Sequence, residues 1–189
     1  MPISTINQNG LNAPLTLTSP TLTSPVLTTP NLGTPSAINL TNATGLSRAA
    51  LPTGSVLQVV YGSTSTTVSS STNTYIDTNL TATITPTRSS SKILVIVDQN
   101  GTNKDTTSPY MAIRIVRGST TVLNYAITDG YSDGSVHRWG SSSASYLDSP
   151  ATTSATTYKT QFCSLGSTAY VEVQNNNAVS TIILMEIAA

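Results

Sequence analysis

Few side chains in this sequence have the types and spacing that catalysis needs. His137 is the only histidine and Cys163 is the only cysteine. A Ser-His-Asp arrangement would need Asp129, Asp133 or Asp148 beside the histidine, together with a G-x-S-x-G turn that the sequence lacks. Cys163 stands at an apolar strand position, which predicts a buried, inert thiol. Since metal-ligand spacing of the Cys/His kind is also missing, we expect neither enzyme activity nor a cofactor.

Two acidic, glycine-bearing segments could in principle hold calcium. Asp98–Asp105 offers oxygen atoms at alternating positions but lacks the bidentate glutamate of an EF-hand loop, and Asp129–Gly134 contains two Asp-Gly pairs. Ordinary turn chemistry explains both segments, so we expect two turns without a bound ion. No pair among the six Asp and two Glu residues has a spacing that would fix it across a sugar, as in glycoside hydrolases.

The best candidate for recognition is the segment that ends at the single tryptophan. Tyr131, His137, Arg138 and Trp139 could present flat apolar rings with polar edges, which suit sugars or the centres of protein interfaces. Tyr110 and Tyr146 could join them. The alternative is that Trp139 belongs to the core or anchors an interface between subunits.

These residues must be positioned by strands, because the sequence changes from Thr53 onward to short β-branched runs bounded by Gly, Pro, Asn or Ser. Gly118-Ser119 between two such runs predicts a hairpin turn. Helical periodicity is missing from this region. The expected strands are Val56–Tyr61, Thr66–Ser70, Tyr75–Thr85, Lys92–Asp98, Tyr110–Arg117, Thr121–Thr128, Ser143–Leu147, Thr157–Leu165, Ala169–Gln174 and Ser180–Ile187.

About ten strands in this length predict an all-β fold, an antiparallel sandwich of the jelly-roll kind. Two of the strands, Ile93–Val97 and Ile182–Met185, are continuous apolar runs. Such runs are typical of strands covered on both faces, since a half-buried strand would alternate.

The N-terminal region is organised differently, as four pentapeptides from Thr16 to Pro35. Helix is excluded there, because a proline every fifth residue removes hydrogen-bond donors and clashes with the preceding turn. In a three-fold extended helix the leucines would spiral around the chain, so either several copies wound about one axis or a winding groove would have to cover them. The pentads therefore predict an assembly segment, whose repeating residues are Leu17, Leu22, Leu27 and Leu32 with Pro20, Pro25, Pro30 and Pro35.

Composition separates an extended arm and connector, residues 1–52, from a β-sandwich head, residues 53–189. Residues 1–47 contain no charged side chain, and the whole chain is only 8% charged with a net charge of zero. Such a surface argues against binding nucleic acid or anionic membrane, and it protects a monomer poorly against association. No signal peptide or membrane span is expected. The composition is that of a protein whose surface is covered by copies of itself.

The pentads and the following LTNATGL, Leu40–Leu46, resemble a linker of tailed-bacteriophage fibre and other virion proteins. The segments Ser143–Phe162 and Ser180–Ala189 resemble the C-terminal jelly-roll domain of phage fibre-like proteins. The linker departs from the family pattern, since Ser47 follows Gly45-Leu46 where a proline is usual. The resemblance implies a virion protein, made in the bacterial cytoplasm, whose head domains form a homotrimer.

Two roles follow from the resemblance. In the first, the arm anchors a short trimeric fibre to a tail or baseplate protein and the head contacts a glycan or protein of the host surface. In the second, the trimer decorates the capsid and its arms staple neighbouring subunits of the major capsid protein. A third role, a small polysaccharide-cleaving enzyme, lacks a catalytic constellation.

Overall fold

The computed structural model describes residue 48 and residues 51–104, 110–129, 137–165 and 170–189. The chain divides into two units, Met1–Ala43 and Thr44–Ala189, and all described residues belong to the second. The pentad leucines and prolines, Leu17 to Pro35, and the candidate recognition residue Tyr131 lie outside the described residues.

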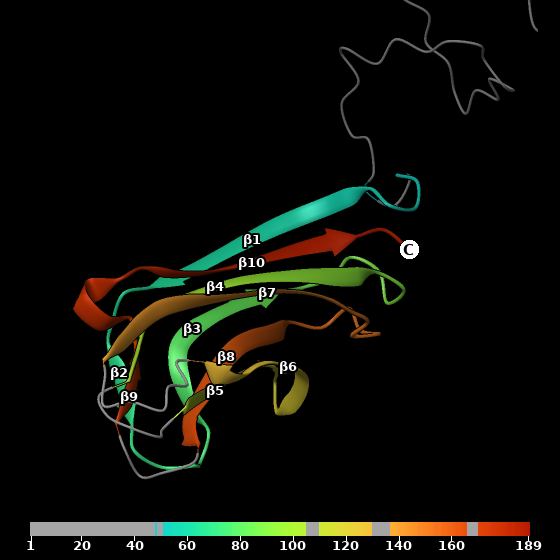
Figure 1. Ribbon diagram of the computed structural model, residues 1–189. Helices are drawn as coiled ribbons and strands as arrows, with labels where there is room; N and C mark the ends of the chain where they lie inside the picture. Colours follow the sequence, from blue (N-terminus) through green and yellow to red (C-terminus); the bar gives the residue numbers. More distant parts are fainter. Residues whose placement is uncertain (1–47, 49–50, 105–109, 130–136, 166–169) are drawn as a thin grey trace, which may run out of the picture. The chain divides into compact units, whose positions relative to one another are not determined.

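The second unit is all-β and consists of two antiparallel sheets (Figure 1). Strand β4 is at the centre of the six-stranded sheet. β10 pairs with the first half of β4, β9 pairs with its last two residues, and β7 pairs along nearly its whole length. The strands of this sheet are β1 (Val56–Thr64), β2 (Val68–Ser70), β4 (Lys92–Lys104), β7 (Arg138–Asp148), β9 (Val171–Val173) and β10 (Ser180–Ile187). The second sheet has the order β3 (Ile76–Ile84), β8 (Thr156–Leu165), β5 (Tyr110–Arg117) and β6 (Thr120–Asp129).

The ten strands expected from the sequence are all present, and the Gly118-Ser119 hairpin turn is confirmed between β5 and β6. Most boundaries differ from the expected ones by three residues or fewer, but two were wrong by five or six residues. Strand β4 continues through Lys104, so the turn expected over Asp98–Asp105 does not form in its described part. Strand β7 begins at Arg138 and not at Ser143, because it pairs with this extension of β4.

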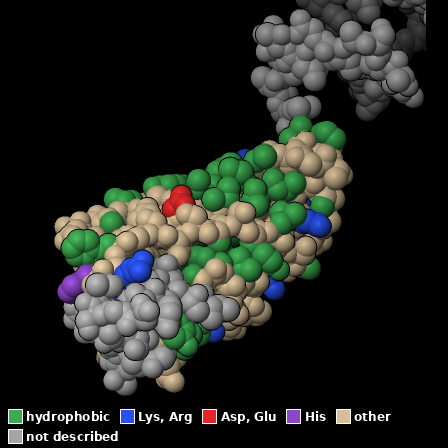
Figure 2. All heavy atoms as spheres, in the orientation of Figure 1, with side chains coloured by type: hydrophobic (Ala, Val, Ile, Leu, Met, Phe, Trp, Pro, Cys, Tyr) green, Lys and Arg blue, Asp and Glu red, His purple; other side chains and the backbone are tan. Residues whose placement is uncertain are grey.

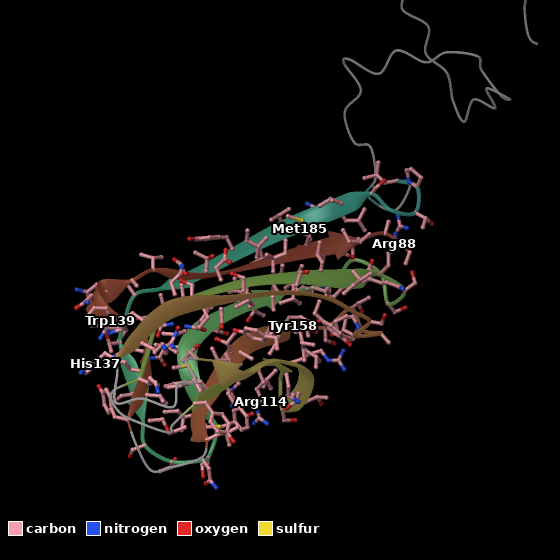
Figure 3. The ribbon with its side chains drawn as sticks, viewed as in Figure 1. Arg88, Arg114, His137, Trp139, Tyr158 and Met185 are labelled. Carbon is pink, nitrogen blue, oxygen red and sulfur yellow. The ribbon has the colours of Figure 1, made fainter. Side chains whose placement is uncertain are left out.

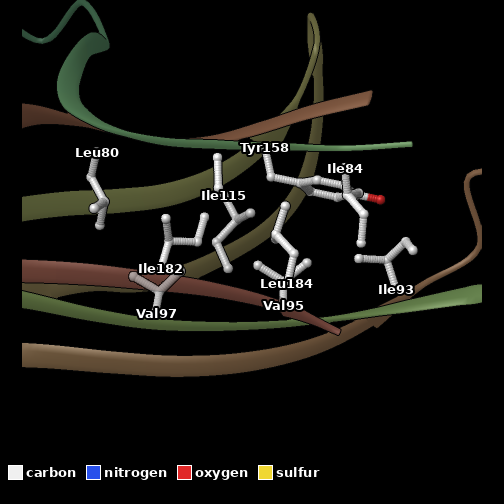
Figure 4. Packing of buried hydrophobic residues seen from close by; sticks show 10 residues of the cluster. Leu80, Ile84, Ile93, Val95, Val97, Ile115, Tyr158, Ile182 and Leu184 are labelled. Atoms are coloured by element: carbon white, nitrogen blue, oxygen red, sulfur yellow. The ribbon is translucent and has the colours of Figure 1, made fainter. Parts of the chain in front are cut away.

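The core lies between the sheets and has two apolar clusters. The larger cluster joins side chains from both sheets, with Tyr158 of β8 against strands β4 and β10 (Figure 4). The smaller cluster comprises Met111, Ile113, Phe162, Val171 and Val173. The buried members of the larger cluster are Leu80, Ala82, Ile84, Ile93, Val95, Val97, Ile115, Tyr158, Ile182 and Leu184.

Polar side chains that are wholly buried bridge the two sheets. Thr160 of β8 donates a hydrogen bond to Gln99 Oε1 of β4 (2.9 Å), and Gln99 Nε2 donates to Ser180 Oγ of β10 (3.0 Å). Thr78 of β3 is hydrogen-bonded to Thr160, and Gln174 is hydrogen-bonded to Ser180. We call these five residues the polar layer. It joins β3 and β8 of one sheet to β4 and β10 of the other.

Strand β4 can continue past its acidic segment because Gly101 forms a β-bulge. Its φ is +61°, and the register shifts between Asn100 and Thr102. A Cβ at Gly101 would stand 2.6 Å from the backbone nitrogen of Asn175 and 2.8 Å from the Cβ of Ala178. Both the left-handed backbone and the close approach of the β9–β10 connection therefore require glycine.

We expect Gly101→Ala to lower the free energy of unfolding by about 2–4 kcal/mol, because backbone strain and steric overlap add. Gly118→Ala is the matched control: its φ is +57°, but nothing lies within 4 Å of the added Cβ, so strain alone should cost about 1–2 kcal/mol. Chemical denaturation measures both. Equal losses would mean that the contact with Asn175 and Ala178 is unimportant.

A buried carboxylate fastens the β3–β4 loop at the other end of β10. Glu186 accepts hydrogen bonds from the backbone nitrogen and hydroxyl of Thr87 (2.7 and 2.8 Å) and from the amide of Gln58 (2.6 Å). Burial raises the pKa of Glu186, but the hydrogen bonds to the carboxylate outweigh burial and lower the pKa below its ordinary 4.5. The ionised form is therefore the one that holds the loop.

The protein should lose stability in acid partly through this residue. A carboxyl whose pKa is lower in the folded than in the unfolded state stabilises the fold above pH 4.5, and this contribution disappears as the pH falls through the folded-state pKa. We expect Glu186→Gln to cost about 2 kcal/mol at neutral pH and to flatten the dependence of stability on pH below 4.5. Urea denaturation at a series of pH values measures both effects, and an unchanged slope would contradict this role.

Candidate assembly surface and recognition residues

The outer face of the six-stranded sheet is apolar where β1, β10, β4 and β7 lie side by side. Ile182 and Leu184 of β10 point into the core, so Ile183 and Met185 point outward, because side chains alternate along a strand. Paired residues share a face, and the register places outward residues in rows across the strands. We call this set the apolar face; its residues are Val56, Val59, Tyr61, Leu94, Ile96, Leu147, Ile183, Met185 and Ile187.

Several of these side chains are open to solvent. Val59 is 56% exposed, Tyr61 61% and Leu147 49%, and Figure 2 shows hydrophobic side chains gathered where these strands lie. Charges on the described part of this region stand at its margins, on Lys92 and on Asp98, which accepts a hydrogen bond from Ser143. A contiguous apolar surface without internal charge is typical of a surface that is covered in the assembled protein.

The outer face of the four-stranded sheet has the opposite character. Asp77 of β3 accepts hydrogen bonds from Lys159 (2.8 Å) and Gln161 (2.7 Å) of β8. Arg114 of β5 donates to Gln161 (3.0 and 2.7 Å) and lies 3.9 Å from the centre of the Tyr75 ring. This face suits water, as one face of an antiparallel sheet usually does. The contrast shows that the apolar face is a local feature of the six-stranded sheet.

The structure separates His137 from Asp148, one of the three acidic residues weighed for a catalytic arrangement; Asp133 lies outside the described residues. His137 immediately precedes β7 and Asp148 is its last residue, about 35 Å away along an extended strand. Asp148 accepts hydrogen bonds from Arg117 (2.6 Å) and Tyr158 (2.7 Å). The prediction of a buried Cys163 is confirmed, and burial raises the pKa of its thiol. In the described segments, no group of three His, Cys, Asp or Glu side chains could hold a metal ion.

The candidate recognition residues gather at one end of β7. The rings of His137 and Trp139 have centroids 6.4 Å apart, and both side chains lie at the end of the molecule opposite Arg88 (Figure 3). Trp139 is 71% exposed, so the alternative that it belongs to the core is wrong. Arg138 is also exposed, at the first position of the strand. Tyr146 lies seven residues farther along β7, about 23 Å from Trp139, and does not join this group.

The sequence did not predict the apolar face as a whole, although two of its strands were recognised as continuous apolar runs. The runs Ile93–Val97 and Ile182–Met185 predicted strands covered on both faces, and their inward residues do contact the core. Their outward residues are the centre of the apolar face. Val59, Tyr61 and Leu147 were not singled out, because their place on this face follows from the pairing of β1 with β10 and of β7 with β4.

Comparison of the chain with protein-family models and with curated proteins found no match. In the described part of the chain, no helix is long and apolar enough to cross a membrane.

Proposed function

We propose that the protein is a structural protein of a tailed-phage particle, a homotrimer that its N-terminal arm anchors to another virion protein and whose β-sandwich faces outward to contact a host receptor. The apolar face is the observation that carries this proposal. Self-association would remove its valine, leucine, isoleucine and methionine side chains from water, at about 25 cal/mol for each Å² of apolar surface buried.

The shape of this region favours a ring of copies over a two-fold dimer. Tyr61 protrudes from β1 at one margin, while Ile96, Asp98, Ser143 and Ser145 line a shallow hollow between β4 and β7 at the other margin. Tyr61 of one copy can fill the hollow of the next, with its hydroxyl donating to Asp98. Contacts between two different patches close into rings when the rotation permits, and a three-fold rotation does so.

The strand order supports a jelly roll. When β1 with β2, and β9 with β10, are counted as two interrupted strands, each sheet has four strands. Six of the seven connections between the eight strands then cross from one sheet to the other, the exception being the β5–β6 hairpin. Eight strands in two such sheets are the pattern of jelly rolls, a common fold of viral structural domains.

The head has two distinct ends, which supports display of one of them. Arg88 donates hydrogen bonds to the carbonyl groups of Arg48 (2.7 Å) and Leu51 (3.2 Å), where the chain enters the head. Trp139 and His137 lie at the opposite end (Figure 3). Anchoring through the preceding residues would leave these rings facing away from the particle.

A capsid decoration or cement protein is the second candidate. Residues 1–47 have no Asp, Glu, Lys or Arg, and an uncharged, proline-rich arm suits extended docking in grooves between capsid subunits. Cryo-electron microscopy of the particle distinguishes the two: copies at capsid three-fold positions favour decoration, and copies on the tail favour a fibre.

Removing residues 1–35 should leave a folded trimer that no longer joins the particle. The core and the apolar face lie wholly within later strands, so thermal unfolding and native mass of the trimer should stay close to those of the full chain. Incorporation is measured by immunoblotting purified phage. Continued incorporation of the shortened protein would show that the pentads are not the anchor.

A further inference from the structure

The β3–β4 loop holds the connector by its carbonyl groups at the point where the connector enters the head. Arg88 of this loop donates hydrogen bonds from a single nitrogen, Nη2, to the carbonyl oxygens of Arg48 (2.7 Å) and Leu51 (3.2 Å). The backbone nitrogen of Leu51 also donates to the Arg48 carbonyl (3.2 Å). Arg48 and Leu51 are thus joined by a turn hydrogen bond and capped by one charged side chain, as basic residues cap the last carbonyl groups of helices.

The loop that carries Arg88 is itself fixed by buried side chains of the six-stranded sheet. Gln58 of β1 donates its amide to the Thr85 carbonyl (2.7 Å) and to the Glu186 carboxylate (2.6 Å). Glu186 of β10, which is wholly buried, accepts from the backbone nitrogen and the hydroxyl of Thr87. Since Thr87 directly precedes Arg88, the carboxylate on β10 determines where the guanidinium begins. We call these contacts the junction clamp; its residues are Arg48, Leu51, Thr87, Arg88 and Glu186.

The chain on the other side of Leu51 is fixed as well. Gly54 donates its backbone nitrogen to the Ala188 carbonyl (2.8 Å), and the backbone nitrogen of Ala188 donates to the Ser55 carbonyl (2.9 Å). Strand β1 is therefore tied to the end of β10 from its first residues onward. Arg48 is the first residue that the structure describes, so the contact with Arg88 is where the connector becomes joined to the head.

The carbonyl group that Arg88 holds belongs to an unusual peptide bond. Arg48 is the only Lys or Arg that precedes Arg88 in the sequence, so the bond that follows Arg48 is the one place in the arm and connector where a protease specific for basic residues can cut. A serine protease binds the carbonyl oxygen of the bond it cuts in its oxyanion hole. In the clamp this oxygen accepts from Leu51 and Arg88 instead, so the turn must open before the protease can act.

We propose that the junction clamp locks the connector to the head: Arg88 keeps Arg48 and Leu51 in the closed turn and thereby protects the bond after Arg48. Glu186 is a positioning residue, because it fixes Thr87 and touches neither Arg48 nor Leu51. The clamp determines the point on the head from which the arm leaves. It lies within one chain, so it operates whether or not the head forms the proposed trimer.

Limited digestion of the full-length protein with trypsin tests the clamp. Hydrolysis adds water across the amide after Arg48, which leaves a carboxylate on Arg48 and an amine on a head fragment of residues 49–189; intact-mass spectrometry follows this fragment with time. Arg88→Met keeps a long unbranched side chain but has no donor. It should be cut after Arg48 about tenfold faster or more, because cleavage of a segment that opens and closes rapidly follows the population of its open form. Equal rates in the variant and the unchanged protein would overturn the clamp.

Glu186→Gln tests the positioning role, with Gly118→Ala as its control. Glu186→Gln weakens the hydrogen bonds to Thr87 without removing any contact of the connector, and it should speed cleavage after Arg48 about threefold or more. Gly118→Ala lowers the stability of the fold by a similar amount, but Gly118 lies in the β5–β6 turn of the other sheet, so the rate should stay that of the unchanged protein. Similar rates in these two variants would refute the role of Glu186.

Cleavage within the head separates opening of the clamp from unfolding of the whole domain. Arg114 lies in the middle of β5, so cleavage after it requires the head to unfold. If Arg88→Met speeds cleavage after Arg114 as much as cleavage after Arg48, the side chain stabilises the whole head and the clamp is wrong. The proposed trimer is tested separately by native mass. A trimer in which Arg88→Met changes nothing would overturn the clamp alone, and a monomer with the expected cleavage would overturn the assembly alone.

Discussion

Replacing Ile183 with glutamate should convert the proposed trimer into folded monomers. Ile183 lies in the middle of the apolar face, in the row with Tyr61 and Ile96, and its side chain points away from the core. A carboxylate there would be buried without a partner in each subunit of the assembly, at a cost of about 3–5 kcal/mol per copy. In the monomer the same carboxylate would face water and cost little. Sedimentation equilibrium should therefore give about 19.7 kDa for the variant and three times that mass for the unchanged chain.

A matched control carries the same charge on the other sheet. Asn124 is exposed on β6 and pairs with Arg114 on the polar outer face, so Asn124→Glu should stay trimeric. Circular dichroism should give the same β spectrum for both variants. A trimeric Ile183→Glu protein would exclude the apolar face from the interface, and an unchanged chain that sediments as a monomer would refute the proposed assembly itself.

The strands were predictable from the sequence because their local signals agreed. β-branched runs bounded by Gly, Pro, Asn and Ser identified all ten strands, and the Gly118 turn followed from the need for positive φ at a tight hairpin. The continuous runs in β4 and β10 also predicted strands apolar on both faces. Local sequence thus carried the elements and the all-β class.

Contacts between distant segments could not be predicted in this way. Asp98–Lys104 reads as a turn, yet it is a strand because Gly101 allows a bulge against Asn175 and because β7 pairs along it. Asn103 and Glu172 are 69 residues apart, and no periodicity links them. Trp139 was a recognition candidate because of its residue type alone. Its neighbours in the sheet could be identified only from the pairing of the strands.

The apolar residues of β4 and β10 do not by themselves determine which face of each strand is buried. The inward set Ile93, Val95 and Val97 and the outward set Leu94 and Ile96 are almost equally apolar, and the same holds for Ile182 and Leu184 against Ile183 and Met185. A shift of one residue would exchange the two sets. Hydrophobic burial therefore hardly favours one register over the other. The polar layer does, because the observed register places Gln99 between Thr160 of the other sheet and Ser180 of β10, where it is hydrogen-bonded to both.

Gln99→Leu should accordingly destabilise the fold. The substitution removes the hydrogen bonds of Gln99 with Thr160 Oγ1 and Ser180 Oγ, and each such bond contributes about 0.5–1.5 kcal/mol. Thr160 keeps its hydrogen bond with Thr78, and Ser180 keeps the one from the backbone nitrogen of Asn100. We expect a loss of about 1–3 kcal/mol in the free energy of unfolding. Because the register is also less well specified, amide peaks of β4 and β10 should broaden or double in a two-dimensional NMR spectrum.

The pair with Thr160 separates lost polar contacts from poor packing of the new leucine. Thr160→Val removes the donor to Gln99, and the double variant Gln99→Leu, Thr160→Val leaves fewer unpaired groups than the two single changes together. The double variant should therefore be about 1–3 kcal/mol more stable than additivity predicts. Strict additivity, with sharp single peaks in Gln99→Leu, would mean that the polar layer does not fix the register. In that case another feature must decide which apolar side of β4 and β10 is presented for assembly.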